Sequence, residues 1–228
     1  MSHFTVAVIH KPEQSVSSLL EPYEATIRVN NKDEEDIRRV LRITRQCLGG
    51  CNNLSDMECW QLATEKYKAD RDGIMHISNP QGKWDWWELG GRWDGHLLDK
   101  SGQKVNSGRI SDLSLKPRED VYSDSLNVWD AVVEGKNNGY YIASLSKHRD
   151  DLRKAFACRE NFARTLSLFS TYAVITPDGE WHEPEKMEWY HTCSNPVEKL
   201  QKWTLGYWDL FLAHANPEWM LTIVSCHK

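Results

Sequence analysis

The stretch His3-Phe-Thr-Val-Ala-Val-Ile-His10 decides the fold that we expect for this chain. Its apolar residues alternate, and Phe4, Val6 and Val8 share one face, as is typical of a β-strand. Residues 219–226, near the other end, show the same kind of pattern. Because the ends of compact domains often come together, we expect these two strands to lie in one sheet.

Helical and strand-like patterns alternate between these two strands. The pattern Ser55-Asp-Met-Glu58 is a capping box that predicts the start of a helix. Helical spacing is found in four stretches, at residues 33–48, 55–67, 146–169 and 196–211. Together these patterns predict a single mixed α+β domain over residues 1–228, with an antiparallel-rich sheet and packed helices.

Turn residues predict two hairpins, at Asn138-Gly139 and at Pro177-Asp-Gly179. The hairpins would join residues 131–133 to 140–142, and residues 171–175 to 180–182. The surrounding region, from about residue 70 to 145, is rich in Gly, Asp and Asn, so we expect turns, strands and exposed loops there.

Composition excludes several classes of protein. The 228 residues are 40% hydrophobic and 27% charged, which is ordinary for a globular protein. No apolar run is long enough for a membrane span, and the start lacks the pattern of a secretory signal. A net charge of −5 argues against a broad surface for duplex DNA. The six cysteines are therefore expected to stay reduced in the cytoplasm.

Residues 84–95, Trp-Asp-Trp-Trp-Glu-Leu-Gly-Gly-Arg-Trp-Asp-Gly, hold four of the 11 tryptophans. Indoles beside an arginine suit a nucleotide-like anion, because the rings stack on a base and the guanidinium pairs with phosphate. A tryptophan-rich turn that seals the core is the alternative. The predicted ligand-binding residues are Trp84, Trp86, Gly90, Gly91, Arg92 and Trp93.

The paired ends would also bring His3 close to Cys226 and His227. A neutral histidine beside a thiol can lower the pKa of that thiol and create a nucleophile, so these three residues form a candidate catalytic site. The same atoms suit zinc. A packed cysteine beside solvated histidines is the structural alternative.

A second enzymatic interpretation comes from His3-Phe-Thr5 and His76-Ile-Ser78. Two His-x-Thr/Ser units on strands resemble the two-histidine phosphoesterases, in which the histidines act as general acid and base. The cysteines at positions 47, 51 and 59 lack the usual zinc spacing and are interpreted as structural thiols. The sequence identifies neither a metal nor a cofactor.

Several motifs, in the same order, resemble a family of uncharacterised phage and bacterial proteins. Members begin MSHFTV, carry KWDW followed by GGRW, and end in Asp-Cys-His. The matching segments are residues 1–6, 79–86, 90–93, 172–181, Met187 with Trp189, and 224–227. This chain differs at Ser225, where the family has Asp, and around residues 188–191. The resemblance implies a phage association but no particular activity.

These observations predict a phage-associated binding protein in the cytoplasm, which is the host cytoplasm if a phage encodes the chain. Its partner would be a nucleotide-like small molecule or a host defence protein, with a role in counter-defence or host modulation. The alternative is a hydrolase, either cysteine/histidine-based at the chain ends or similar to the two-histidine phosphoesterases.

Overall fold

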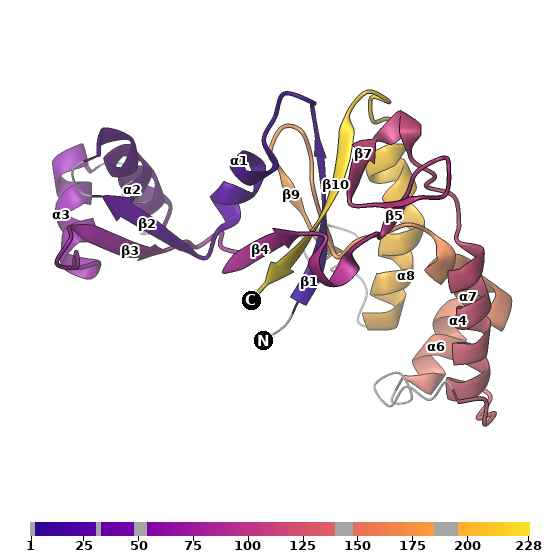
Figure 1. Ribbon diagram of the computed structural model, residues 1–228. Coiled ribbons are helices and arrows are strands. Elements are labelled where there is room, and N and C mark those ends of the chain that lie inside the picture. The colour runs from indigo at the N-terminus through magenta and orange to yellow at the C-terminus, as the bar shows by residue number, and fades with distance from the viewer. Residues whose placement is uncertain (1–2, 31–32, 48–53, 140–147, 185–195) are drawn as a thin grey trace. The chain divides into compact units, whose positions relative to one another are not determined.

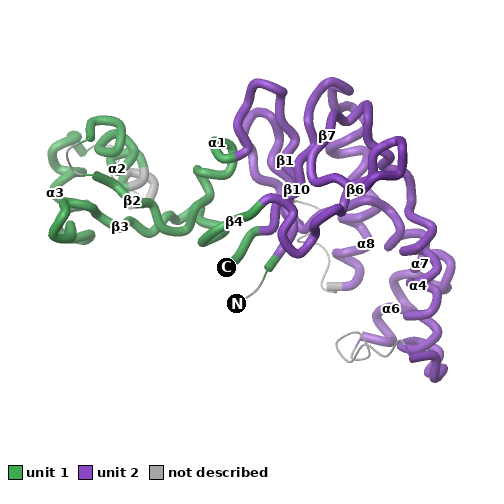
Figure 2. The backbone as a smooth tube through the Cα atoms, viewed as in Figure 1, with its two compact units in different colours: residues 1–3, 17–88, 226–228 green, residues 4–16, 89–225 purple. Residues whose placement is uncertain are grey.

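The computed structural model describes residues 3–30, 33–47, 54–139, 148–184 and 196–228 (Figure 1). Its contacts divide the chain into two compact units (Figure 2). Unit 1 contains residues 1–3, 17–88 and 226–228, and unit 2 contains residues 4–16 and 89–225. Helices and mainly antiparallel strands give the α+β fold class that the sequence predicts. None of the helices described is both long and apolar enough to cross a membrane.

Among the described residues, six strands form one sheet that contains both terminal strands. Its order is β4 (Trp86–Leu89), β10 (Met220–His227), β1 (His3–His10), β8 (Ala173–Ile175) and β9 (Trp181–His182), and β7 (Ser107–Arg109) also pairs with β10. The predicted pairing of the two terminal strands is therefore confirmed. A side-chain hydrogen bond between His10 Nε2 and Thr222 Oγ1, 3.0 Å long, joins them across 212 positions.

The core of unit 2 lies between this sheet and helix α8 (Pro196–Tyr207). Trp203 and Tyr207 of α8 are fully buried against apolar residues of β1, β8 and β10. Their polar atoms keep partners, because Trp203 Nε1 donates to the Thr171 carbonyl at 2.7 Å and the Tyr207 hydroxyl lies 2.7 Å from Thr171 Oγ1. The core therefore contains two large aromatic rings without unpaired polar atoms at their tips.

The hairpin predicted around residue 178 is present, since β8 and β9 pair antiparallel with Val174 opposite His182. The helix predicted over residues 146–169 is two helices, α6 (Arg149–Phe156) and α7 (Arg159–Ser167). The chain turns between them at Ala157, whose φ of 61° lies in the left-handed region and cannot continue a right-handed helix.

The strand predicted at residues 131–133 is wrong, because Ala131 and Val132 end helix α4 (Glu119–Val132). Its expected partner, residues 140–142, lies outside the described residues. Helices α4, α6 and α7 and the start of α8 enclose a second apolar cluster, made of Trp129, Val132, Val133, Leu152, Phe156, Phe162 and Val197.

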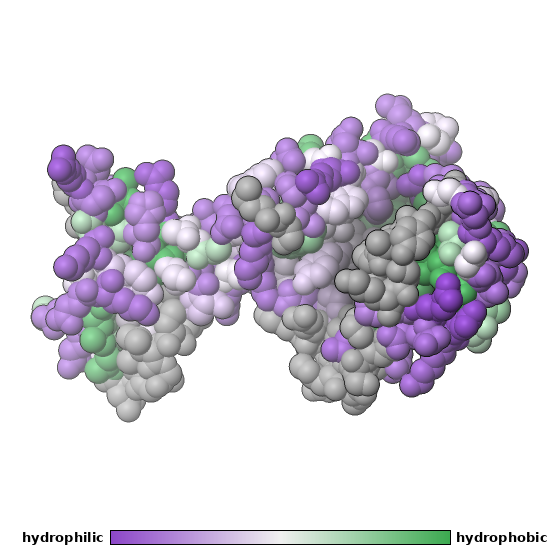
Figure 3. Space-filling model, turned by 90° about the horizontal axis from the view of Figure 1, so that it is seen from below, coloured by the Kyte–Doolittle hydropathy of each residue, from purple (hydrophilic) through white to green (hydrophobic). Residues whose placement is uncertain are grey.

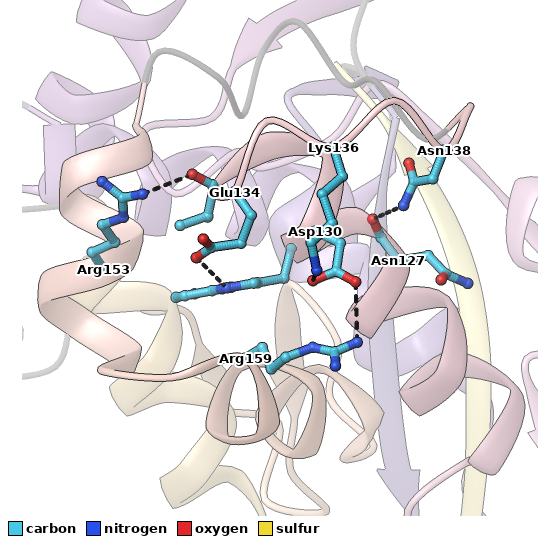
Figure 4. A network of polar contacts seen from close by, with 9 residues as sticks. Asn127, Asp130, Glu134, Lys136, Asn138, Arg153 and Arg159 are labelled. Atoms are coloured by element: carbon cyan, nitrogen blue, oxygen red, sulfur yellow. Dashed lines mark hydrogen bonds and ion pairs between the residues drawn. The ribbon is translucent and has the colours of Figure 1, made fainter.

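A polar network at the end of α4 holds these helices together (Figure 4). Arg153 donates to the Val133 carbonyl at 2.9 Å, which satisfies a group left free at the end of the helix. Asp130 accepts contacts from Lys136 at 3.1 Å and from Arg159 at 3.2 Å. Because every labelled cation has a structural partner, we assign this network to stability.

Unit 1 contains a small core built by residues 26–78. Strands β2 (Thr26–Asn30) and β3 (Ile74–Ser78) pair antiparallel beside helices α2 (Glu34–Cys47) and α3 (Asp56–Lys66). The capping box is present, since the Ser55 N–H donates to Glu58 Oε2 at 2.8 Å and the Glu58 N–H donates back to Ser55 Oγ at 3.3 Å. The core consists of Ile27, Val29, Val40, Ala63, Met75 and Ile77.

Short elements complete the two units. Helix α1 (Val16–Leu20) and the 3₁₀ turn η1 (Glu21–Tyr23) precede β2, and in unit 2 the elements are η3 (Gly91–Trp93), β5 (Leu97–Leu98), β6 (Lys104–Val105) and η4 (Ile110–Asp112). On the face shown in Figure 3, hydrophilic residues cover most of the described surface, and apolar residues form small separate patches.

Candidate functional site

Three aromatic rings of unit 1, one each from strands β1, β4 and β10, meet in one cluster. The Trp86 indole stacks on the His227 imidazole, with ring centroids 5.1 Å apart and planes at 19°. His3 meets both rings edge-on, 5.0 Å from His227 and 5.6 Å from Trp86. This terminal ring cluster joins one residue of the predicted ligand-binding set to two of the predicted catalytic residues.

The backbone around Trp84 positions Trp86 within this cluster. The Lys83 N–H donates to the Tyr23 carbonyl at 2.7 Å, and the Asp85 N–H donates to the His227 carbonyl at 2.7 Å. Trp84 itself is buried, so it anchors the chain and leaves no ring surface for a ligand. The tryptophan-rich turn therefore has a structural part, Trp84, and an accessible part, Trp86.

Close backbone contact also explains the motif that precedes Trp84. A Cβ atom on Gly82 would lie 2.6 Å from the Ala25 Cα, closer than real Cβ atoms approach, so only glycine fits there. The Asn79 side chain donates to the carbonyls of Pro22 at 2.7 Å and Glu24 at 2.8 Å. Residues 79–84 thus dock on residues 22–25 and hold the start of β4.

The cluster has one accessible face and one buried polar atom. The Trp86 residue is 43% exposed, whereas His227 is only 7% exposed. Within the described part of the chain, nothing hydrogen-bonds His227 Nδ1, although this atom is buried. A buried polar atom without a partner costs free energy, so this atom favours a site that a ligand or a water completes.

Cys226 lies in a different environment from its neighbour His227. Successive strand residues point to opposite faces, and Cys226 is completely buried. Burial raises the pKa of the Cys226 thiol from 9.0 to about 12. The thiol therefore stays protonated at neutral pH, whereas nucleophilic catalysis requires the thiolate.

The predicted ligand-binding residues are divided between the two units, with Trp84 and Trp86 in unit 1 and residues 90–93 in unit 2. Trp93 packs partly buried against the core of unit 2. Arg92 is exposed, and no hydrogen bond or ion pair joins it to any other described residue. It also lines none of the three cavities of about 790, 140 and 570 Å³ found among the described residues.

The paired glycines before Arg92 serve a local turn. Gly90 has a φ of 66°, and a Cβ atom there would lie 2.5 Å from the Asn106 side-chain nitrogen. Asn106 in turn accepts a hydrogen bond from the Gly95 N–H at 2.7 Å. Sequence reasoning missed Asn106, because no local pattern links it to a turn some 11 positions away.

The structure gives the phosphoesterase interpretation no support. His3 lies on β1 of the six-stranded sheet, whereas His76 lies on β3 of the separate β2–β3 pair, opposite Arg28. In the described residues, no three His, Cys, Asp or Glu side chains are grouped as a metal site. Cys59 is buried, and Cys51 lies outside the described residues.

Sequence reasoning also missed an apolar cavity of about 790 Å³ in unit 2. Its lining comes from three separate stretches, residues 100–117, 168–169 and 204–208. Because these three stretches lie far apart in the sequence, no single motif predicts the cavity.

Comparisons of the chain with protein-family models, with curated proteins and with solved structures gave no match. Geometry and chemistry therefore carry the functional assignment.

Proposed function

We propose that the protein binds a nucleotide-like anion at the terminal ring cluster, with the base on Trp86 and the anionic group beside the imidazoles of His3 and His227. The observation that carries this proposal is the stacking of Trp86 on His227, which orients an indole that is still 43% exposed. Stacking of a base on such a ring contributes about 1–3 kcal/mol.

The imidazoles supply the polar half of the proposed site. Ring nitrogens donate hydrogen bonds to phosphate oxygens, and protonation adds a charge to that contact. His227 Nδ1 is buried without a partner among the described residues, and its desolvation costs free energy in the folded protein. A ligand that reaches this atom would form a hydrogen bond that offsets this cost. His3, edge-on to both other rings, borders the same accessible indole.

Binding is favoured over hydrolysis by the state of Cys226. A cysteine hydrolase at the chain ends needs a thiolate, and the pKa of about 12 opposes it. The resemblance to phage proteins supports the remainder of the proposal, namely counter-defence or host modulation in the host cytoplasm. A host protein docking on Trp86 is the competing partner.

Calorimetric titration with AMP, GMP, CMP and UMP tests this proposal, with adenosine and ribose 5-phosphate as half-ligands. We expect at least one nucleotide to bind more tightly than either type of half-ligand. The substitution Trp86→Ala should weaken binding about tenfold or more, since a stacked base is lost. The control Leu89→Ala removes another exposed apolar side chain from β4 and should change Kd less than about twofold.

Thermal melts of each variant separate loss of binding from loss of folding. Unchanged nucleotide affinity in a folded Trp86→Ala protein would contradict the proposal, as would the absence of binding by all four nucleotides. The variant Cys226→Ala tests the hydrolase. If the wild type converts a bound nucleotide and Cys226→Ala binds it without turnover, the hydrolase replaces the binding protein.

A further inference from the structure

The apolar cavity in unit 2 has the size and lining of a small-molecule site. Its volume of about 790 Å³ lies within the range of roughly 300–1,000 Å³ that ligand pockets span. Most of its wall is aliphatic or aromatic, formed by Ile110, Leu113, Leu115, Leu168, Phe169 and Trp208.

Backbone hydrogen bonds fix the segment from Asp112 to Arg118, which forms one wall. The Lys100 N–H donates to the Asp112 carbonyl at 2.9 Å, and the Ser114 N–H donates to the Leu98 carbonyl at 2.8 Å. At the other end of the segment, the Arg118 N–H donates to the Ser167 carbonyl at 3.0 Å. The wall is therefore held at both ends before any ligand arrives, which lowers the entropic cost of binding.

Another part of the wall, at Trp208, follows a change of helix type after α8. Residues Trp208–Leu212 form a π-helical turn, in which the Ala213 N–H donates to the Trp208 carbonyl at 2.8 Å. Phe211 and Leu212 are buried, whereas Trp208 is 49% exposed. Such turns are rare and are often found at functional sites, and this one presents an indole to the cavity.

Two cations, Lys100 and Lys116, are the charged residues that line the cavity, and its described lining contains no carboxylate. Neither lysine forms an ion pair with another described residue. The chain as a whole carries a net charge of −5, so this local positive charge is unlike the average of the molecule. An anionic group would therefore find complementary charge at the cavity.

A smaller cavity of about 140 Å³ shares Lys116 with the apolar cavity and is also lined by Arg118 and His96. Arg118 already pairs with Asp120. Burial, and then the nearby Arg118, lower the pKa of His96, so this imidazole is neutral at pH 7. Lys100 and Lys116 consequently remain the cations available to a ligand.

We propose that unit 2 binds an amphipathic monoanion, with an aliphatic body in the apolar cavity and a single anionic head beside Lys100 and Lys116. Burial of hydrocarbon against the apolar wall favours the aliphatic body, and the two lysines, whose side chains pair with no other described residue, favour a negative head group. This proposal is independent of the nucleotide site, because every residue that carries it lies in unit 2.

Three octyl probes of equal length test it by calorimetry: octanoate, 1-octanol and octylamine. Octanoate should bind most tightly and octylamine most weakly. A double substitution, Lys100→Gln with Lys116→Gln, should weaken octanoate binding about tenfold, since each exposed charge contributes about threefold to the affinity. The matched control Lys154→Gln removes an exposed lysine of α6 that lines neither cavity, and should leave the affinity unchanged.

A second readout locates the ligand. In protein labelled with 5-fluorotryptophan, Trp208→Phe identifies the Trp208 resonance, which octanoate should shift. Octyl sulfate, a monoanion like octanoate, distinguishes the head groups: equal affinity with octanoate shows that only the charge is recognised, and weaker affinity shows a site specific for a carboxylate. Equal binding of 1-octanol and octanoate, no shift at Trp208, or a shift that follows protein concentration through self-association would each overturn the proposal.

Discussion

Trp86 and Trp208 are nearly equal in exposure, at 43% and 49%, yet their surroundings are opposite in character. Trp86 stacks on an imidazole and meets a second one, whereas Trp208 borders a cavity of aliphatic side chains with two lysines. An exposed indole marks each place as a candidate site, because large apolar surface is costly in water. The residues around each indole then determine which kind of ligand it can bind.

The largest expected effect is on stability, and it distinguishes these two exposed indoles from a buried one. Trp203 is 1% exposed in the core of unit 2, so Trp203→Ala should lower the free energy of unfolding by about 3–5 kcal/mol. Trp208→Ala, on the same helical stretch, should lower it by less than about 1 kcal/mol. Urea denaturation followed by circular dichroism measures both. Similar losses would show that Trp208 is part of the core and would remove the basis of the comparison.

A crossed titration should give the next largest effect. Trp86→Ala should weaken nucleotide binding by about 1–3 kcal/mol and leave octanoate binding unchanged, whereas Trp208→Ala should weaken octanoate binding and leave nucleotide binding unchanged. Each variant is thus the control for the other, since both lose one exposed indole. If either substitution weakens both ligands in a folded protein, the two places do not act as separate sites.

The smallest expected effect concerns pH. In the unfolded chain His96 titrates near 6.5, and burial lowers its pKa in the fold. The contribution of His96 to the free energy of unfolding is fully present above about pH 6.5. It falls as the pH drops below that value, because the unfolded state then takes up a proton more readily than the folded state. We expect His96→Gln to flatten the decline of the melting temperature between pH 7.5 and 5.5. Exposed His214→Gln is the control, and an identical slope in His96→Gln and wild type would contradict the assignment.

The sequence predicted those parts of the fold whose pattern is local. Alternation marks β1, and the Ser55–Glu58 capping box marks α3, because each depends on neighbours a few positions apart. Helix α4 was missed because polar Ser125 is buried on its inner face and interrupts the apolar period. Beyond Tyr207, the π-helical turn leaves Leu210 exposed at 47%, although regular helical spacing predicts that it is buried.

The candidate sites also combine features that the sequence predicts with features that depend on tertiary structure. The density of tryptophan drew attention to Trp86, and the terminal strands drew attention to His3 and His227, but no pattern in the sequence joins these three rings. Their contact requires the pairing of β4, β10 and β1, which is a tertiary property. Arg92 looked equally informative in the sequence, yet it is exposed and no other described residue pairs with it.

The hydrogen bond that joins His10 to Thr222 across 212 positions has a consequence for synthesis of the protein. Strand β1 emerges first, but its neighbours β8 and β10 begin only at residues 173 and 220. At about 5–20 residues per second, the ribosome needs on the order of ten seconds or more to reach them. During that time the apolar strand β1 has neither of its partner strands, so the nascent chain is exposed to aggregation until they follow.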